Sequence, residues 1–321
     1  MKKNIKKIAT LVGMTLLTIS LAACGGKETT IDNYPSREIQ MVIPWGPGGG
    51  SDIEGRIVIE HVQNSLDSGI VPINLPGVGG TVGLMELEEE EANGYHLGQI
   101  HEGLIVAHHS GITPINFDSF EPIASMSATD QILAVSSHLN ITTLDEFVEY
   151  GRNEEVRFGG TVAGIPRVWI EQMVRELEIN HNLVGYEGLT EAIQALAGGH
   201  VDAVIVDFAS AKDFVEAGYM NFIAIGTAER VAAAPDLPTF VESGYDLLFG
   251  LNRGYVAPKG TSQEIIEVLA KAFEEAANDP AYVEAIRNIG SDVAFMGPQE
   301  YREHLERQDS IIKEIIEEIS E

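Results

Sequence analysis

The chain has 321 residues, a single cysteine and a formal net charge of −29, which comes from 49 acidic and 20 basic side chains. One cysteine excludes an intrachain disulfide and a cysteine-based metal site. The excess of negative charge disfavours binding to nucleic acid or to anionic lipid, and an anionic ligand would need a local reversal of the electrostatic potential.

The N-terminus has the pattern of a bacterial secretion signal. A lysine-rich start precedes an apolar run over residues 8–23, which is shorter than the roughly 20 apolar residues that a membrane-spanning helix needs. The sequence LAAC, ending at Cys24, resembles a lipobox, in which the cysteine becomes the first mature residue and carries a diacylglycerol. We therefore expect a lipoprotein signal peptide over 1–23, lipid attachment at Cys24 and a tether over 24–33. The alternative is an ordinary signal peptide with a chance cysteine.

The rest of the chain alternates short apolar runs, typical of strands, with amphipathic runs, typical of helices. Strands are expected at 39–44, 69–76, 96–101, 121–127, 131–137, 156–161, 181–186, 201–207, 221–227 and 253–258. Helices are expected at 51–66, 81–92, 103–111, 143–152, 165–178, 189–199, 209–218, 262–278, 280–290 and 298–320, with Thr143 as an N-cap. This alternation predicts an α/β fold of right-handed βαβ units with mainly parallel sheets.

The segment PWGPGGGSD, residues 44–52, lies between the first strand and the first helix. Glycines let several backbone N–H groups approach a ligand, and the helix dipole adds a partial positive charge there, so the segment predicts an anion site without a side-chain cation. A P-loop would need a lysine, and the dinucleotide fingerprint would need glycine or alanine where Ser51 stands, so nucleotide binding is disfavoured. Asp52 caps the helix or braces a neighbouring loop, and Ser51 does the same or offers its hydroxyl to a ligand.

Other predicted strand ends carry related features. PGVGGTVG, residues 76–83, is a second glycine cluster, and VRFGGTVAGIPRVWI repeats the strand, glycine turn and helix of the first loop. Two similar lobes would thus present one such turn each across a cleft, since ligands bind at the carboxyl ends of parallel strands. His101, Glu102, His108 and His109 lie near a third strand end, but their spacing gives no complete metal-ligand set, so no metal is expected.

These segments together resemble the extracytoplasmic solute receptors of tripartite tricarboxylate transporters, the Bug receptors. The similar segments are YPSREIQMVIPWGPGGGSDI, LPGVGGTVG, ANGYHLG, GYEGLTEAIQALAGGHVDAVIVD, AGYMNFIAIGTAERVAAAPDLPTFVESGY and YVAPKGTSQEII, and the resemblance spans residues 34 to about 315. It implies a two-lobed clamshell of the type II periplasmic-binding fold, each lobe a mainly parallel sheet flanked by helices. We expect lobe 1 over 34–135 and 256–321, and lobe 2 over 136–255.

The resemblance also implies that backbone amides and ordered water hold a ligand carboxylate between the lobes. The candidate ligand-binding residues are Trp45, Gly48, Gly49, Gly50, Ser51, Asp52, Gly80, Thr81, His101, Gly160, Thr161, Ala163, Gly164, Pro166, Tyr186, Asp207 and Arg253. Trp45 either walls the pocket or packs under the loop, and Trp169 is expected in the core. Arg253 is either a second carboxylate partner or part of a structural salt bridge near the hinge. Glu187 stands where the family often has a basic residue.

The implied function is that of a non-enzymatic receptor without a cofactor. It would be an extracytoplasmic, lipid-anchored monomer that captures a small organic acid and delivers it to the membrane permease subunits of the transporter. A di- or tricarboxylate is expected, with an aromatic carboxylate as the alternative ligand. The same fold would also serve as a ligand-sensing partner of a signalling receptor. An enzyme on a similar frame is disfavoured, because no base is paired with a nucleophile.

Overall fold

The computed structural model describes residues 33–66, 68–162 and 164–320. The chain divides into residues 1–34 and a compact unit of residues 35–321, which contains both sheets. The expected signal peptide and Cys24 lie outside the described residues, as do nearly all of the tether and Ala163. In the described ranges, no helix is both long enough and apolar enough to span a bilayer.

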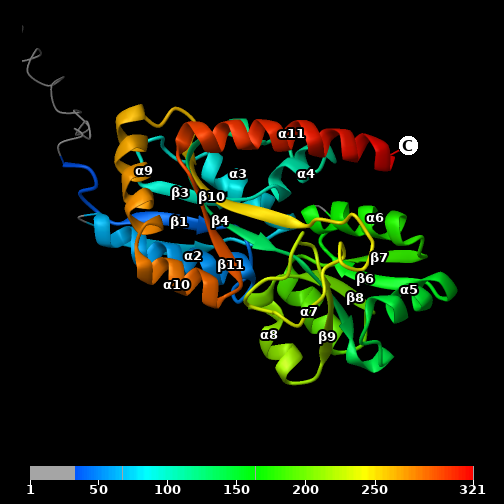
Figure 1. Cartoon of the computed structure of the whole chain (residues 1–321). Helices are drawn as coiled ribbons and strands as arrows, with labels where there is room; N and C mark the ends of the chain where they lie inside the picture. The colour runs from blue at the N-terminus through cyan, green and yellow to red at the C-terminus, as the bar shows by residue number, and fades with distance from the viewer. Residues whose placement is uncertain (1–32, 67, 163, 321) are drawn as a thin grey trace, which may run out of the picture. The chain divides into compact units, whose positions relative to one another are not determined.

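The first sheet has the strand order β11-β4-β10-β3-β1-β2 (Figure 1). Its strands are β1 (Ile39–Ile43), β2 (Ile70–Asn74), β3 (His96–Ile100), β4 (Phe120–Asp130), β10 (Gly250–Pro258) and β11 (Ser291–Met296). β1 lies parallel between β2 and β3, whereas β10 runs antiparallel to both β3 and β4, and β11 runs antiparallel to β4. β1 is apolar and almost entirely buried, as expected for a strand at the centre of an α/β sheet.

Helices from both ends of the chain flank this sheet. They are α2 (Gly50–Val62), α3 (Thr81–Glu88), α4 (Gly103–His109), α9 (Gln263–Ala277), α10 (Pro280–Asn288) and α11 (Pro298–Ser320). α9 and α11 pack on β4, and α10 packs on α2 and β11. Short 3₁₀ segments at Gln63–Ser65, Val78–Gly80 and Phe117–Ser119 connect these elements.

The second sheet has the strand order β7-β6-β8-β5-β9. Its strands are β5 (Ile132–Ser136), β6 (Val156–Gly160), β7 (His181–Gly185), β8 (Ala203–Val206) and β9 (Met220–Ile225). The helices that follow its strands are α5 (Leu144–Asn153), α6 (Ile165–Leu177), α7 (Leu189–Ala197) and α8 (Phe208–Glu216), and a 3₁₀ turn spans Ser137–Leu139. Thr143 caps α5 in a full capping box with Glu146, which confirms the predicted N-cap.

The α/β class and the periplasmic-binding type of fold are confirmed, but both sheets are mixed rather than mainly parallel. β5 runs antiparallel to β8 and β9, while β6 pairs in parallel with β7 and β8. β5 follows β4 directly, and β10 enters the first sheet from residues 226–249, so no crossover helix sets the direction of either strand. β11 was not predicted, because SDVAFM is short and lies between two strong helix patterns.

The chain passes from the first sheet to the second at Gln131, between β4 and β5, and returns through residues 226–249 into β10. The expected lobe boundaries at 135/136 and 255/256 fall inside β5 and β10. Strand membership alone would move them to Gln131 and Gly250. The division into two lobes stays a prediction.

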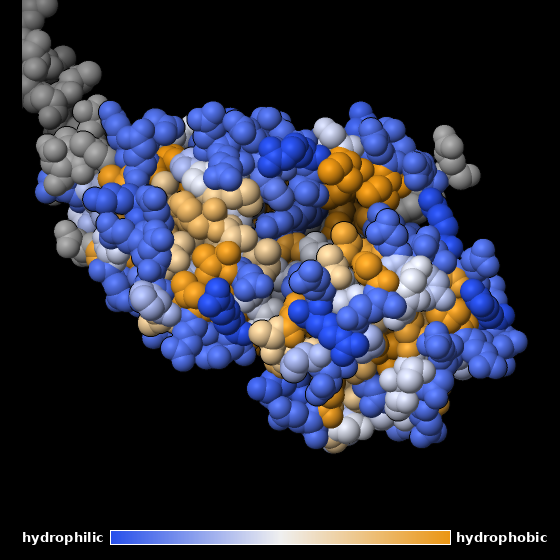
Figure 2. All heavy atoms as spheres, in the orientation of Figure 1, coloured by the Kyte–Doolittle hydropathy of each residue, from blue (hydrophilic) through white to orange (hydrophobic). Residues whose placement is uncertain are grey.

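One apolar cluster runs through both halves of this unit. It joins side chains of the first sheet, such as Phe120 and Val256, to side chains of the second, such as Phe158 and Trp169. A smaller cluster, around Ile193 and Val204, lies between the second sheet and the helices α7 and α8. Figure 2 shows that hydrophilic residues cover most of the visible face, with smaller hydrophobic areas between them, as the large negative charge would suggest.

Candidate ligand-binding site

The glycine-rich loop between β1 and α2 presents backbone groups, rather than side chains, to the candidate site. Gly48 has φ of +82°, a left-handed conformation that favours glycine. Gly49 is the N-cap of α2 and the helix has no side-chain cap, so its first-turn amides are not covered by a hydroxyl or carboxylate of the cap residue. Gly49 and Gly50 are buried and line a cavity.

Asp52 holds this loop in place from behind. Its carboxylate accepts hydrogen bonds from the Gly48 N–H at 3.0 Å, from Asn74 Nδ2 at 2.9 Å and from Arg56 Nε at 2.9 Å. Asn74 also donates to the backbone oxygen of Trp45 at 3.0 Å, which ties the end of β2 to the same loop. The expectation that Asp52 braces neighbouring loop structure is confirmed, and its three partners leave it outside the cavity lining.

Trp45 and His101 form one wall of the site. Their rings stack with centroids 4.2 Å apart and an angle of 14° between the planes. Burial lowers the pKa of His101 to about 3; the positive charge of Arg253 acts in the same direction, against the opposing effect of Glu102. The Gly103 N–H donates to His101 Nδ1 at 2.9 Å, so the neutral ring carries its proton on Nε2. His101 can therefore donate a hydrogen bond without adding charge.

The second glycine cluster lines the cavity through Pro76, Gly77 and Gly79, and its Gly80 supports the Trp45 wall. A Cβ on Gly80 would come within 3.0 Å of the Trp45 ring, so glycine is needed there for close packing. Thr81 begins α3 and is buried, and its Oγ1 donates to the backbone oxygen of Val78 at 3.0 Å. The sequence predicted Gly80 and Thr81 as ligand contacts, but neither lines the cavity.

The second sheet contributes a similar turn at the end of β6. Gly160 and Thr161 precede Gly164, which is the N-cap of α6, and this helix also has no side-chain cap and has Pro166 in its first turn. A Cβ on Gly164 would collide with the Thr161 hydroxyl, so the turn needs glycine at this position. Tyr186 follows β7 and donates its N–H to the Gly160 oxygen at 3.0 Å, but its side chain does not line the cavity.

A third uncapped helix, α7, begins at the same place. Its N-cap is Gly188, again without a side-chain hydrogen bond. By contrast, α5, α8, α9 and α10 each have a cap side chain that accepts a backbone N–H, supplied by Thr143, Asp207, Ser262 and Asp279. The positive ends of α2, α6 and α7 are therefore free of a cap side chain, whereas α8, whose cap Asp207 also lines the cavity, begins with its first turn capped.

These turns surround a cavity of about 350 Å³. Of the predicted residues, those that line it are Trp45, Gly49, Gly50, Ser51, His101, Gly160, Thr161, Gly164, Pro166, Asp207 and Arg253. Those that do not are Gly48, Asp52, Gly80, Thr81 and Tyr186. Whether the lining residues contact ligand stays a prediction.

Several lining residues were not among the predicted contacts. Trp169 is a core residue, 5% exposed, as expected, and it also faces the cavity from α6. Gln131, at the passage between the sheets, and the segment 187–191 at the start of α7 also line it. The GYEGLTE phrase was part of the resemblance, and its glycine before a helix pattern was the signal that could have identified this segment.

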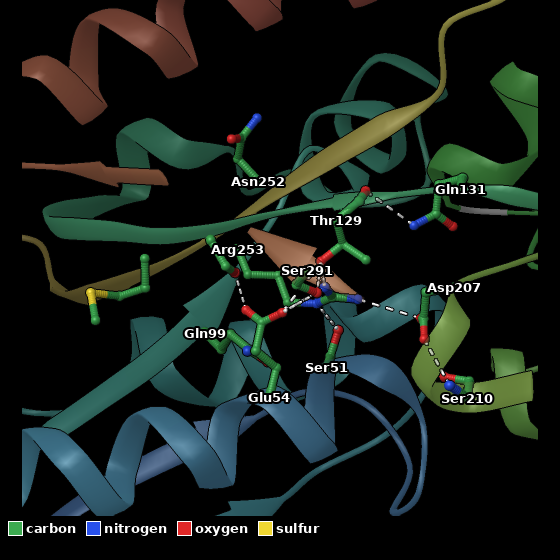
Figure 3. Close-up of polar contacts among 12 residues, drawn as sticks. Ser51, Glu54, Gln99, Thr129, Gln131, Asp207, Ser210, Asn252, Arg253 and Ser291 are labelled. Atoms are coloured by element: carbon green, nitrogen blue, oxygen red, sulfur yellow. Dashed lines mark hydrogen bonds and ion pairs between the residues drawn. The ribbon is translucent and has the colours of Figure 1, made fainter. Parts of the chain in front are cut away.

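Arg253 lies at the inner end of the cavity in a buried polar cluster (Figure 3). It is 3% exposed, its Nη1 donates to Glu54 Oε2 at 2.9 Å, and its Nε donates to Ser51 Oγ at 3.2 Å. Its Nη2 lies 3.5 Å from Asp207 Oδ2, and Thr129 accepts a further hydrogen bond from Nη1. The salt-bridge interpretation of Arg253 therefore describes its observed partners, and a ligand contact stays a prediction.

The same cluster links the two sheets. Glu54 is on α2, fully buried, and is bonded to Ser127 and Thr129 as well as to Arg253. Asp207 follows β8 and accepts the Ser210 N–H at 2.9 Å as the cap of α8. A Cβ on Gly50 would collide with the Asp207 carboxylate, so the second sheet approaches the start of α2 closely.

Two mixed sheets, with uncapped helix starts converging on a cavity, define a solute-binding protein of the periplasmic type. The chain belongs to the tripartite tricarboxylate transporter family receptors, whose family model matches residues 55–320. This confirms the resemblance stated from the sequence. The described residues contain no group of three or more His, Cys, Asp or Glu side chains placed to hold a metal ion.

Individual proteins agree with this assignment. The chain is 26% identical to protein BugT of Bordetella pertussis, over 97% of this chain and 98% of BugT. The structure of the periplasmic binding protein BugD is similar with a TM-score of 0.82 and 25% identity, covering 89% of this chain and 98% of BugD. The structure of R. palustris Rpa4515 with adipate has a TM-score of 0.83 and 22% identity, covering 88% of this chain and 97% of that protein.

Proposed function

We propose that this protein is a non-enzymatic receptor that captures a small organic carboxylate between two lobes and delivers it to the membrane permease subunits of a tripartite tricarboxylate transporter. One observation carries the proposal: α2 of the first sheet and α6 of the second begin at one cavity with glycine N-caps and no side-chain caps. Such paired helix starts offer backbone donors and partial positive charge to an anion.

This arrangement explains how a strongly acidic protein could bind an anion. The molecule is strongly acidic, but a carboxylate at the cavity would meet oriented N–H groups and the neutral His101 donor before it meets the surface charge. A carboxylate that accepts hydrogen bonds from backbone amides away from bulk water is held more strongly than in the open. The adipate in the R. palustris relative agrees with a carboxylate as ligand.

The extracytoplasmic location agrees with the receptor family, and the anchor is part of the proposal. We expect the Cys24 thiol to carry a diacylglycerol, because the sequence before it has the lipobox pattern. Replacing Cys24 with serine should move the protein from the membrane fraction to the soluble fraction after cell fractionation. Retention of the Cys24→Ser variant in the membrane would contradict lipid attachment at this residue.

A thermal-shift screen tests the receptor function itself. The purified chain is heated with each member of a panel of carboxylates, and with amines and sugars of similar size as controls. A ligand that binds only the folded state adds about 2.7 kcal/mol of stability at a hundredfold excess over Kd, so carboxylates should raise Tm. A rise with amines or sugars, and none with any carboxylate, would overturn the proposal.

A further inference from the structure

The middle of the cavity is apolar. Its walls include Trp45, Ile165, Trp169, Leu189 and Leu251, contributed by elements of both sheets. Ile165, Trp169 and Leu251 are each no more than 6% exposed, so these side chains have little contact with solvent outside the cavity. A ligand body that fills this space gains free energy in proportion to the apolar area that it buries.

The cavity has one basic side chain in its lining, and this side chain is already neutralised. Among the described lining residues, Arg253 is the only lysine or arginine. Its guanidinium is in ion pairs with Glu54 at 2.9 Å and Asp207 at 3.5 Å, so two carboxylates already share one cation. His101 stays neutral, because burial keeps its pKa far below 6.5. The side chains therefore offer no net positive charge to a second carboxylate.

The part of the cavity that the start of α7 lines is acidic. Glu187 and Glu191 line it from the start of α7, and both are exposed at its rim. Glu187 Oε2 accepts the Val78 N–H from the first sheet's side at 3.1 Å, and Glu191 Oε2 accepts the Glu187 N–H at 3.1 Å. The protein's own carboxylates thus occupy amides that a second ligand carboxylate would need, and they surround that position with negative charge.

We propose that the cavity selects ligands with one carboxylate and an apolar body, and that Glu187 and Glu191 reject a second carboxylate at the rim. This inference rests on the proposed function and narrows it. The single ligand carboxylate would lie at the uncapped starts of α2 and α6, and the apolar body between Trp45 and Trp169. Of the ligands expected from the sequence, an aromatic carboxylate fits better than a di- or tricarboxylate.

Matched ligand pairs test the selectivity. Isothermal titration calorimetry on the purified full-length chain in detergent compares benzoate with terephthalate, and hexanoate with adipate, so that each pair differs in a second carboxylate. We expect the monocarboxylate of at least one pair to bind. Its affinity should be roughly tenfold or more higher than that of its dicarboxylate, because the second ligand carboxylate would lie a few ångströms from the glutamate charges in a partly screened site. Equal or tighter binding of terephthalate and adipate would overturn this inference and leave the receptor proposal standing. No binding of any carboxylate would overturn both.

Variants then test the two glutamates. The double variant Glu187→Gln, Glu191→Gln should lower the ratio of monocarboxylate to dicarboxylate affinity roughly fivefold, because it removes two negative charges from the rim. Glu149→Gln is the matched control, since Glu149 is an exposed glutamate on α5 that does not line the cavity, and its ratio should equal that of the wild type. A ratio unchanged in the double variant, or changed equally in the control, would contradict a role for Glu187 and Glu191.

Discussion

Arg253 shows at the scale of single residues how a buried charge acts in this site. It connects Glu54 on α2 with Asp207 at the end of β8, and all three side chains are at most 3% exposed. Taking such charges out of water is costly, and the cost is offset only while each keeps its partners. The cluster therefore ties the two sheets together at the inner end of the cavity, whether or not Arg253 also touches a ligand.

Replacing Arg253 with alanine should lower the free energy of unfolding by roughly 3–5 kcal/mol, because Glu54 would stay buried without its cation. Urea denaturation measures this loss. The double variant Arg253→Met, Glu54→Gln should recover part of it, since the only buried carboxylate of the cluster then left without a cation is Asp207, which keeps its hydrogen bond from the Ser210 N–H. If Arg253 also bound ligand directly, Arg253→Ala would weaken dicarboxylates more than monocarboxylates, whereas we expect similar losses for both.

His101 makes the stability of the protein sensitive to acid. Its pKa is about 3 in the folded protein and 6.5 in an ordinary environment, so between these values the unfolded chain binds a proton that the folded chain does not. Stability contributed by the neutral ring is therefore lost as the pH falls below 6.5. Between pH 7 and pH 5 the free energy of unfolding should fall by about 2 kcal/mol more in the wild type than in His101→Gln. Urea denaturation at pH 7 and at pH 5 measures both losses. Equal losses in the wild type and in His101→Gln would contradict a neutral buried His101.

At the scale of secondary structure, the N-terminal ends of three helices provide the backbone donors of the candidate site. α2, α6 and α7 have glycine N-caps beside the cavity, whereas Thr143, Ser262 and Asp279 cap helices that begin elsewhere. A capping side chain at Gly49, Gly164 or Gly188 would stabilise its helix but would occupy the donors that a ligand needs. The glycines thus leave the first-turn amides without a cap side chain, at some cost in helix stability.

Replacing Gly49 with valine should weaken carboxylate binding at least tenfold with little change in Tm. The backbone of Gly49 has φ of −81°, and its added Cβ would lie 3.5 Å from Thr190 Oγ1, so the fold tolerates a side chain that enters the cavity. Gly297→Val is the matched control, because Gly297 has open space around its Cβ position and does not line the cavity. Unchanged affinity in Gly49→Val, measured by calorimetry, would contradict the role of these amides.

At the scale of the whole binding unit, the two sheets and the chain segments that connect them determine how the protein could close around a ligand. The chain passes between the sheets at Gln131 and through residues 226–249, and the cavity is lined from both sheets. We expect a ligand to draw the lobes together, as hinge closure excludes water around the bound group.

Small-angle X-ray scattering measures such closure. The radius of gyration of the purified protein should fall when a saturating carboxylate is added, and it should not fall for the Gly49→Val variant at the same concentration. A radius of gyration that stays the same with bound ligand, under conditions where calorimetry shows saturation, would favour a preformed closed state.

The local elements could be read from the sequence because they depend on near neighbours. The N-cap at Thr143, the glycine turn at residues 46–50 and the amphipathic helices follow from periodicity and turn chemistry over a few residues. The resemblance added the family, and the division into lobes stays a prediction. Even so, β11 was missed, because a six-residue strand between two helices has a weak local signal.

The amino-acid sequence by itself determined the α/β class, nearly all the strands and helices, the family, and the glycine loops that line the cavity. Only the tertiary structure decided the antiparallel directions of β4, β5 and β10, the partners of Arg253, and the separation of lining glycines from supporting ones such as Gly80. The physical reason is distance along the chain. Arg253 meets Glu54 and Glu187 meets Val78 across 199 and 109 positions, and no local pattern of residues encodes such a contact.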